Sequence, residues 1–185
     1  VQNDAEFIIV GSNSSSNSSL KCIDFYGGWC NIQIYNKRLN EAISNCRFFG
    51  ADYAVYQDSQ DELTDIRFSL FCQNFTSIYL GIDGTYGADV ELLVDNVIID
   101  NNYGDQTFGV VLSGEQATSD FSSLKLTNLI ITKSFCGWYI DSEWFYPPIM
   151  SNIAYYDNYY NDNLWDSSFQ QNPMYLNQSP FEEPE

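Results

Sequence analysis

The stretch AISNCRFFGADYAVY, residues 42–56, decides the fold, because close relatives of it occur elsewhere in the same chain. By itself the stretch allows two interpretations: a helix that carries a cysteine and leads into a loop, or one turn of a repeating coil. Internal repeats of 20–50 residues indicate stacked architectures. Residues 126–143, LTNLIITKSFCGWYIDSE, align with it and match Phe48 with Ile131 and Val55 with Trp138.

One apolar position recurs along the chain with a base spacing near 23 residues. Its members are separated by 23, 23, 28, 32 and 24 residues, and the extra residues fall in inserts rich in Gly, Asp and Ser. An Asn stands three residues before four of these positions, at Asn45, Asn96, Asn128 and Asn152. The recurring apolar position, called the anchor column here, consists of Phe25, Phe48, Phe71, Ile99, Ile131 and Tyr155.

Each repeat contains short runs such as NIQIY, SIYLGI and LKLTNLIIT. Alternating apolar residues and β-branched side chains are typical of strands. Strands this short bury one face only by stacking coil on coil, which predicts an all-β solenoid. In such a stack the recurring Asn residues are expected to face inward and to bond to the Asn above and below, as in other ladders of identical side chains.

The repeat resembles that of right-handed parallel β-helix proteins, with coils like those of pectate-lyase-type folds, and is also similar to short repeats of bacterial and protist surface adhesins. The resemblance implies about six short coils over residues 20–165. Residues 1–19 are expected to form an N-terminal strand and a glycosylatable Ser/Asn linker, and residues 166–185 an acidic tail. Such a resemblance is informative for architecture and not for function.

A second resemblance leads to a different fold. Residues 35–71 are similar to the helix–Cys–Gly beginning of a C-type lectin domain. The second half of the chain lacks the calcium-site motifs of that family, and a lectin fold does not explain the recurring Asn. The β-helix is therefore the preferred interpretation.

The charge balance is strongly acidic, with 7 Lys and Arg against 25 Asp and Glu, a formal charge of −18 and a pI near 4.1. A surface of this sign repels phosphate backbones, so nucleic acid is not an expected partner. The chain has no His, which removes the usual general base and the commonest metal ligand. No apolar run reaches the ~20 residues that a membrane-spanning helix needs, so membrane insertion is not expected.

The cysteines and the glycosylation sequons favour an extracellular setting. Five cysteines follow no zinc-like spacing, and Cys22 and Cys46 lie 24 residues apart, close to one repeat. They are the candidates for a disulfide between adjacent coils. Sequons occur at Asn13, Asn17, Asn74 and Asn177.

Catalytic chemistry is not predicted. Asp58 and Asp141 share a column but belong to different coils, whereas glycoside hydrolysis needs two carboxylates ~5–9 Å apart. Calcium is the only cofactor considered, at the oxygen-rich stretches 98–105 and 157–166, although neither matches a known calcium motif. The aromatic residues proposed for glycan contact or for a subunit interface are Trp144, Tyr155, Tyr156, Tyr159, Tyr160 and Trp165.

The sequence therefore predicts a non-enzymatic, secreted or cell-surface glycoprotein with a structural or adhesive role. Self-association end to end or through the tails is expected, because a short stack exposes unpaired strand edges at both ends. One form of this prediction is the repeating subunit of an extracellular fibre. The alternative is a β-helix that binds or cleaves polysaccharides.

Overall fold

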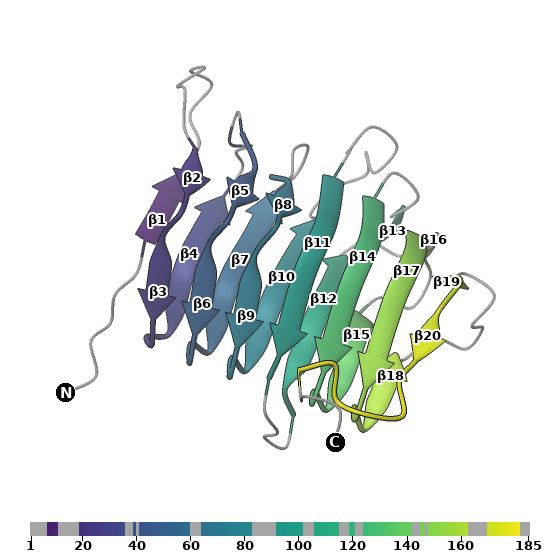
Figure 1. The fold of residues 1–185 in the computed structure, drawn as a ribbon. Helices are drawn as coiled ribbons and strands as arrows, with labels where there is room; N and C mark the ends of the chain where they lie inside the picture. The colour runs from purple at the N-terminus through teal and green to yellow at the C-terminus, as the bar shows by residue number, and fades with distance from the viewer. Residues whose placement is uncertain are drawn as a thin grey trace.

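Short strands stack in parallel and form a β-solenoid of about five turns, as the repeat predicts (Figure 1). The computed structural model describes residues 7–10, 19–35, 39, 41–59, 64–82, 92–101, 106–114, 119–120, 124–141, 145–146, 148–162 and 170–181. These residues contain strands and turns but no helix. Among them, accordingly, no helix is long and apolar enough to cross a membrane.

Sheet A has seven strands, one from each coil and one from the N-terminal segment. Every pairing between neighbouring strands of this sheet is parallel. In spatial order the strands are β1 (Phe7–Val10), β4 (Cys30–Tyr35), β7 (Tyr53–Ser59), β10 (Thr76–Ile82), β12 (Phe108–Gly114), β15 (Cys136–Asp141) and β18 (Tyr160–Asp162).

Sheet B has eleven strands, because several coils contribute two short strands in place of one long strand. The divided coils contain β2 (Leu20–Lys21) with β3 (Asp24–Tyr26), β5 (Ile43–Ser44) with β6 (Arg47–Phe49), β8 (Ile66–Arg67) with β9 (Leu70–Cys72), and β19 (Gln170–Gln171) with β20 (Met174–Tyr175). The continuous strands are β11 (Leu92–Asp100), β14 (Leu124–Thr132) and β17 (Ile149–Tyr156). A separate two-stranded sheet pairs β13 (Ser119–Asp120) with β16 (Phe145–Tyr146).

The anchor column is confirmed residue by residue. Each of its members pairs with the next in the register of sheet B, and Tyr155 continues the column to Tyr175. The rings of Phe25, Phe48 and Phe71 stack with centroids 4.9 and 4.6 Å apart. The column contributes the centre of the core, since its members from Phe48 to Tyr155 are at most 2% exposed.

The recurring Asn residues do not face inward, so that prediction is wrong. Asn45, Asn96, Asn128 and Asn152 are exposed, with φ between 53° and 55°. Left-handed backbone is unfavourable for most side chains, whereas Asn tolerates it. Asn recurs because each coil of sheet B bends at this position. The equivalent positions in the remaining coils, Cys22, Phe68 and Asn172, have φ of 56°, 50° and 55°.

A buried polar ladder does exist, but at the next corner of the coil, after the anchor column. Asn74 accepts a hydrogen bond from Ala51 N (3.0 Å) and donates to Phe48 O (3.3 Å). Asn101 donates to Ser134 Oγ (3.2 Å), and Ser134 N donates to Asn158 Oδ1 (2.9 Å). These side chains satisfy backbone groups that the corner would otherwise leave unpaired.

Asn74→Ala is expected to lower the free energy of unfolding by about 2–4 kcal/mol, because each of two buried backbone groups left without a partner costs ~1–3 kcal/mol. Chemical denaturation monitored by circular dichroism measures the change. Asn177→Ala replaces an exposed Asn and is the matched control, with an expected change below about 0.5 kcal/mol. Equal midpoints for the two variants would contradict the ladder.

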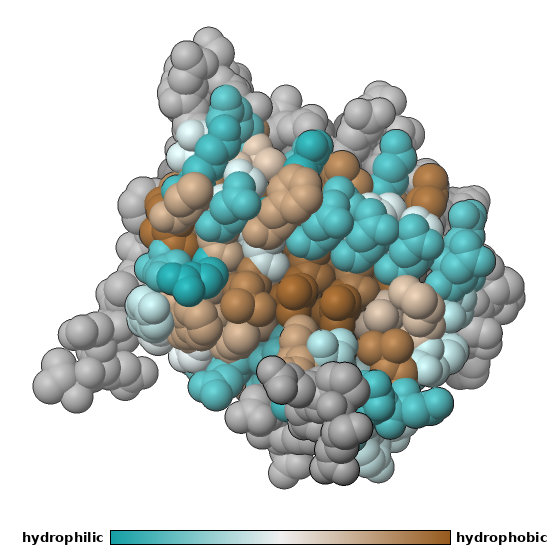
Figure 2. All heavy atoms as spheres, in the orientation of Figure 1, coloured by the Kyte–Doolittle hydropathy of each residue, from teal (hydrophilic) through white to brown (hydrophobic). Residues whose placement is uncertain are grey.

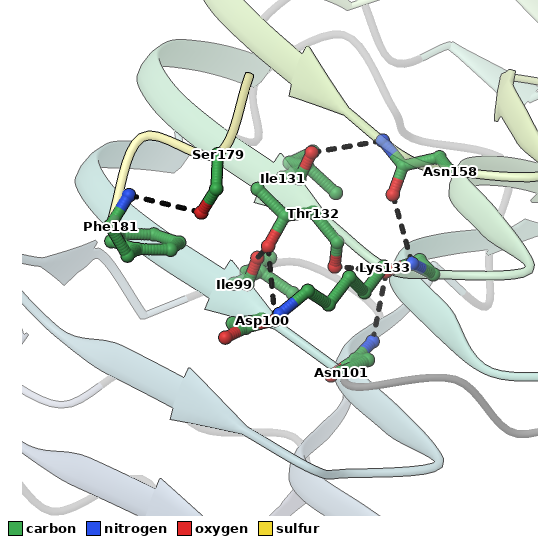
Figure 3. Close-up of polar contacts among 10 residues, drawn as sticks. Ile99, Asp100, Asn101, Ile131, Thr132, Lys133, Asn158, Ser179 and Phe181 are labelled. Carbon is green, nitrogen blue, oxygen red and sulfur yellow. Dashed lines mark hydrogen bonds and ion pairs between the residues drawn. The ribbon is translucent and has the colours of Figure 1, made fainter. Parts of the chain in front are cut away.

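Strand pairing reaches beyond residues 20–165 at both ends. β1 pairs with β4 and adds a strand to sheet A. β19 and β20 pair with β17 and form the C-terminal edge of sheet B. Sheet A therefore ends at β1 on one side and at β18 on the other (Figure 1). The C-terminal segment then runs back beside the corner formed by β11 and β14, where Ser179 and Phe181 lie near Asp100 and Lys133 (Figure 3).

Candidate functional site

The most extended surface feature is a band of aromatic side chains on the outer face of sheet A. Strand residues alternate between the two faces, and the inward positions are apolar, as at Ile32, Ile78 and Val110. The outward positions and the adjoining corner hold aromatic rings in every coil. This aromatic band consists of Trp29, Tyr35, Tyr53, Tyr56, Phe75, Tyr79, Phe108, Phe135, Tyr139, Tyr159 and Tyr160.

The N-terminal half of the aromatic band is rich in tyrosine. Tyr56 and Tyr79 are in register on adjacent strands, and their rings stack 4.6 Å apart. Tyr53 contacts both of them edge to face, at 5.6 and 6.1 Å, and Trp29 packs against Tyr53 at 5.7 Å. Burial and the nearby Asp58 raise the pKa of Tyr56 and of Tyr79. A tyrosine is already neutral at physiological pH, and the raised pKa extends the neutral state of both side chains to more alkaline pH.

The C-terminal half continues the band with phenylalanine and tyrosine. Phe108 contacts Phe135 at 6.4 Å and Tyr139 at 5.5 Å. Phe135 stacks on Tyr159 at 5.3 Å, and Tyr159 meets Tyr160 edge to face at 4.6 Å. The last two rings are the most exposed of the band, at 68% and 52%. Offset and edge-to-face pairs of this kind are favourable beyond their buried area, so the rings hold one another in place.

A polar column runs beside the aromatic band on the same strands. In the register of sheet A it contains Asp58, Gly81, Ser113 and Asp141. The described basic residues lie elsewhere, on the strands of sheet B or directly after one of them: Lys21, Arg47, Arg67, Lys125 and Lys133. Within the described residues, the face with the aromatic band thus carries carboxylates and no cation.

The outer face of sheet B is different in character. Leu70, Ile98 and Ile130 form one outward column by register, and polar residues flank it. Figure 2 shows the mixed apolar and polar surface on the side turned to the viewer. At the adjoining corner, Lys133 Nζ lies 3.8 Å from Asp100 Oδ1, which also accepts a hydrogen bond from Thr132 Oγ1 at 3.1 Å (Figure 3).

Asp95 is the centre of a polar network on this face. Its carboxylate accepts hydrogen bonds from Thr127 Oγ1 (2.7 Å), Asn128 Nδ2 (2.8 Å) and Asn96 Nδ2 (2.6 Å). Asn152 Nδ2 in turn donates to Asn128 Oδ1 at 3.1 Å. Partial burial alone would raise the pKa of Asp95, but these hydrogen bonds and Arg67 outweigh it and lower the pKa. The expected Asn ladder is thus a short outer chain that ends on a carboxylate.

Asp95→Asn is expected to destabilise the chain at pH 7 and to have little effect near pH 2. A carboxyl group with a lowered pKa in the folded state stabilises the fold above its unfolded pKa of ~3.9, and this contribution disappears as the pH falls through the folded value. Urea midpoints of both proteins across pH 2–7 test this. Thr127→Val removes one of the three donors and is expected to give a smaller loss at pH 7. A difference that persists unchanged at pH 2 would contradict the assignment.

The aromatic residues proposed from the sequence for glycan or subunit contact lie in different parts of the structure. Tyr159 and Tyr160 belong to the aromatic band, whereas Tyr155 is a core residue, 2% exposed, and cannot contact a ligand. Tyr156 lies on β17 of sheet B, and Trp144 and Trp165 lie outside the described residues. Sequence reasoning missed Tyr53, Tyr56, Tyr79 and Phe108. Tyr56 and Tyr79 directly follow the inward Val55 and Ile78, and this alternation marks them as outward. Tyr53 and Phe108 stand two residues before Val55 and Val110, so strand alternation alone does not mark them as outward.

The glycosylation sequons differ in how far their asparagine side chains are exposed. Asn74 is completely buried and bonded in the corner ladder, so the folded chain does not present it for glycosylation. Asn177 is exposed. Asn13 and Asn17 lie outside the described residues.

The predicted Cys22–Cys46 disulfide is not formed in the structure, where no disulfide joins any of the five cysteines, all of which lie within the described residues. Cys22 is the exposed left-handed residue of its coil, whereas Cys46 is buried and its thiol donates to Ser44 O at 3.4 Å. The register pairs Leu20 with Ile43, so Cys22 is level with Asn45 and not with Cys46. A disulfide between the two cysteines would require the first coil to shift by one residue. Burial raises the pKa of Cys46, and that of Cys136 to about 12, so these thiols stay protonated.

Asp58 and Asp141 lie in the same column of sheet A but are too far apart to act as the two catalytic carboxylates of a glycoside hydrolase. Asp58 and Asp141 are three strand steps apart in the register, which corresponds to about 14 Å and exceeds the ~5–9.5 Å of glycoside hydrolases. The described residues contain no group of three or more His, Cys, Asp or Glu that could hold a metal ion. Both stretches considered for calcium, 98–105 and 157–166, extend outside the described residues.

Comparisons of the chain with protein-family models, with curated proteins and with solved structures give no match. Function is therefore inferred from the arrangement of the residues themselves.

Proposed function

We propose that the protein is a non-enzymatic adhesive or structural solenoid that acts outside the cell, either secreted or at the cell surface. The observation that supports this most directly is the aromatic band, which follows sheet A from Trp29 in the first coil to Tyr160 in the last. A long and repetitive surface favours contact with an extended partner over the enclosure of a small substrate, for which concave pockets are typical.

The composition of the band supports a binding role. Aromatic residues are enriched at interfaces, because a ring offers a large apolar area at a low cost in conformational entropy. Trp29 and Phe75 are 47% and 40% exposed, so the band is not merely an outer layer of the core. The extracellular setting is supported by the accessible sequon at Asn177 and by the acidic surface.

End-to-end association is a second part of the proposal. β1 and β18 each have a neighbour on one side only within sheet A, and such edge strands offer unpaired backbone groups to another chain. In this arrangement the C-terminal β18 of one copy would pair with the N-terminal β1 of the next, which gives a fibre because the contact does not close. Light scattering and electron microscopy over a range of concentrations test it, and a monodisperse monomer throughout would contradict it.

Adhesion through the band is tested with immobilised extracellular matrix and with intact cell surfaces. The double variant Trp29→Ala/Tyr159→Ala removes two exposed rings from opposite ends of the band and is expected to reduce retention at least tenfold. Phe68→Ala is the matched control, because Phe68 is also exposed, at 56%, but lies between β8 and β9 of sheet B. Unchanged retention of the double variant, or an equal loss in the control, would contradict the proposed role of the band.

A further inference from the structure

We infer that the aromatic band is the binding site for a single chain of neutral polysaccharide that lies along the solenoid axis. This inference rests on the proposed function and specifies the partner. It follows from three properties of the described residues: the length of the band, the chemistry of its rings and of the column beside them, and the sign of the charge around it.

The length of the band requires an extended ligand. Its residues occupy six successive positions in the register of sheet A, from Cys30 to Tyr160. Five steps of ~4.8 Å place the ends of the band about 24 Å apart. The ring contacts connect the first three coils with one another, and likewise the later coils from Phe75 to Tyr160. A small molecule would use only a fraction of this surface.

The chemistry of the band suits an amphipathic polymer. The exposed rings of Trp29, Phe75, Tyr159 and Tyr160 provide apolar contact area, whereas Tyr56 and Tyr79 stack face to face and offer their edges. Tyrosine hydroxyl groups and the neighbouring Asp58, Ser113 and Asp141 provide hydrogen-bonding groups along the same strands. A pyranose ring has the same two properties, with C–H groups on its faces and hydroxyl groups at its rim. Gly81 has no side chain of its own, and the Asp58 carboxylate leans over it, with Oδ1 3.0 Å from the position that a Cβ would take. This carboxylate therefore lies directly beside Tyr79 of the band.

The charge of this face excludes the acidic polysaccharides. Asp58 flanks the N-terminal half of the band and Asp141 the C-terminal half, and Asp52 is exposed on the corner between Trp29 and Phe75. The described Lys and Arg residues lie on strands of sheet B or directly after one of them. A polymer of uronic acids or of sulfated sugars would meet repulsion from these carboxylates, and the described residues of this face offer no cation to offset it. A neutral polymer is not repelled by the carboxylates and can donate hydrogen bonds to them, which are stronger than hydrogen bonds between neutral groups.

The test is affinity gel electrophoresis of the full chain with soluble neutral glucans, mannans and xylans, with polygalacturonate as the anionic probe. We expect at least one neutral polymer to bind and polygalacturonate not to bind. With neutral oligosaccharides, the affinity is expected to rise with length until the oligomer spans about 24 Å. Trp29→Ala/Tyr159→Ala is expected to weaken binding at least tenfold, and Phe68→Ala less than twofold.

One further variant and one measurement guard against loss of folding. Trp29→Phe keeps a ring and is expected to bind within about threefold of the natural chain, and circular dichroism confirms that each variant retains its strands. Binding of polygalacturonate in preference to neutral polymers, or neutral binding that survives the double variant, would overturn the inference. So would loss of self-association in the double variant without any polysaccharide binding, since a second copy would then occupy the band.

The failure of this inference and that of the proposed function give different results. If adhesion depends on the band but no neutral polymer binds, the ligand class is wrong and the adhesive role stands. If a neutral polymer binds at the band but the protein adheres to no matrix or cell surface, the ligand class is right and the adhesive role is wrong.

Discussion

Gly109→Ala is expected to prevent the coils from stacking, with a loss of at least about 3 kcal/mol in the free energy of unfolding. A Cβ atom on Gly109 would overlap the carbonyl oxygen of Gly137 in the next coil. The same approach recurs one coil further, where a Cβ on Gly137 would lie 2.5 Å from Asn161 O. Backbone oxygens cannot rotate away as a side chain does, so the coils would have to separate.

Gly50→Ala is the control for this variant. Its φ of +69° disfavours alanine, but nothing lies within 4 Å of the added Cβ atom. A cost of only about 1 kcal/mol is expected from the backbone conformation. Urea denaturation followed by circular dichroism compares the two. If Gly109→Ala unfolds at the same urea concentration as Gly50→Ala, the close approach of the coils at this corner is not a determinant of stability.

Phe48→Ala is expected to cost about 3–5 kcal/mol, because it removes a fully buried ring and leaves a cavity in the stack. Phe48 is the middle of three stacked rings, so its loss removes both the contact to Phe25 and the contact to Phe71. A solenoid is stabilised by the interfaces between adjacent coils. The loss of Phe48 is therefore expected to destabilise the two adjacent coils as well as its own coil.

Phe68→Ala again provides the comparison, because the residue type is the same but the ring is 56% exposed and its φ is 50°. Its replacement is expected to change the free energy of unfolding by less than about 0.5 kcal/mol. The urea midpoint and its slope measure both variants. Similar losses for the two phenylalanines would mean that the anchor column does not dominate the core.

The sequence by itself determined the repeat, its register and the composition of the core. The anchor column is identifiable because the coils stack in register, so a buried position must be apolar in every coil at an equivalent place. A second apolar column, seven residues after the anchor column in the first coils, is equally visible in the sequence. It consists of Ile32, Val55, Ile78, Val110 and Trp138 and ends at Asp162, which pairs with Trp138. The inserts do not hide the repeat, because they lie between strands and leave the pairing of residues within the strands unchanged.

Only the tertiary structure decided which way the polar residues of the repeat face. A recurring Asn is compatible with an inward ladder and with an outward left-handed bend, and the sign of φ at Asn45 and its siblings distinguishes the two. The inward ladder at Asn74, Asn101 and Asn158 was not recognised, because Ala51 and Ser134 interrupt the pattern in the sequence while hydrogen bonds continue it in space.

The same distinction applies to the candidate site. The aromatic band combines residues from every coil, and no contiguous stretch of the sequence contains more than a few of them. Tyr155 and Tyr159 are equally plausible ligand contacts from sequence, yet the first is buried and the second is exposed, since one lies in the anchor column and the other at the corner of the coil. Local sequence thus specifies which coil positions are apolar, whereas only the stacking of coils determines which aromatic rings form a continuous surface.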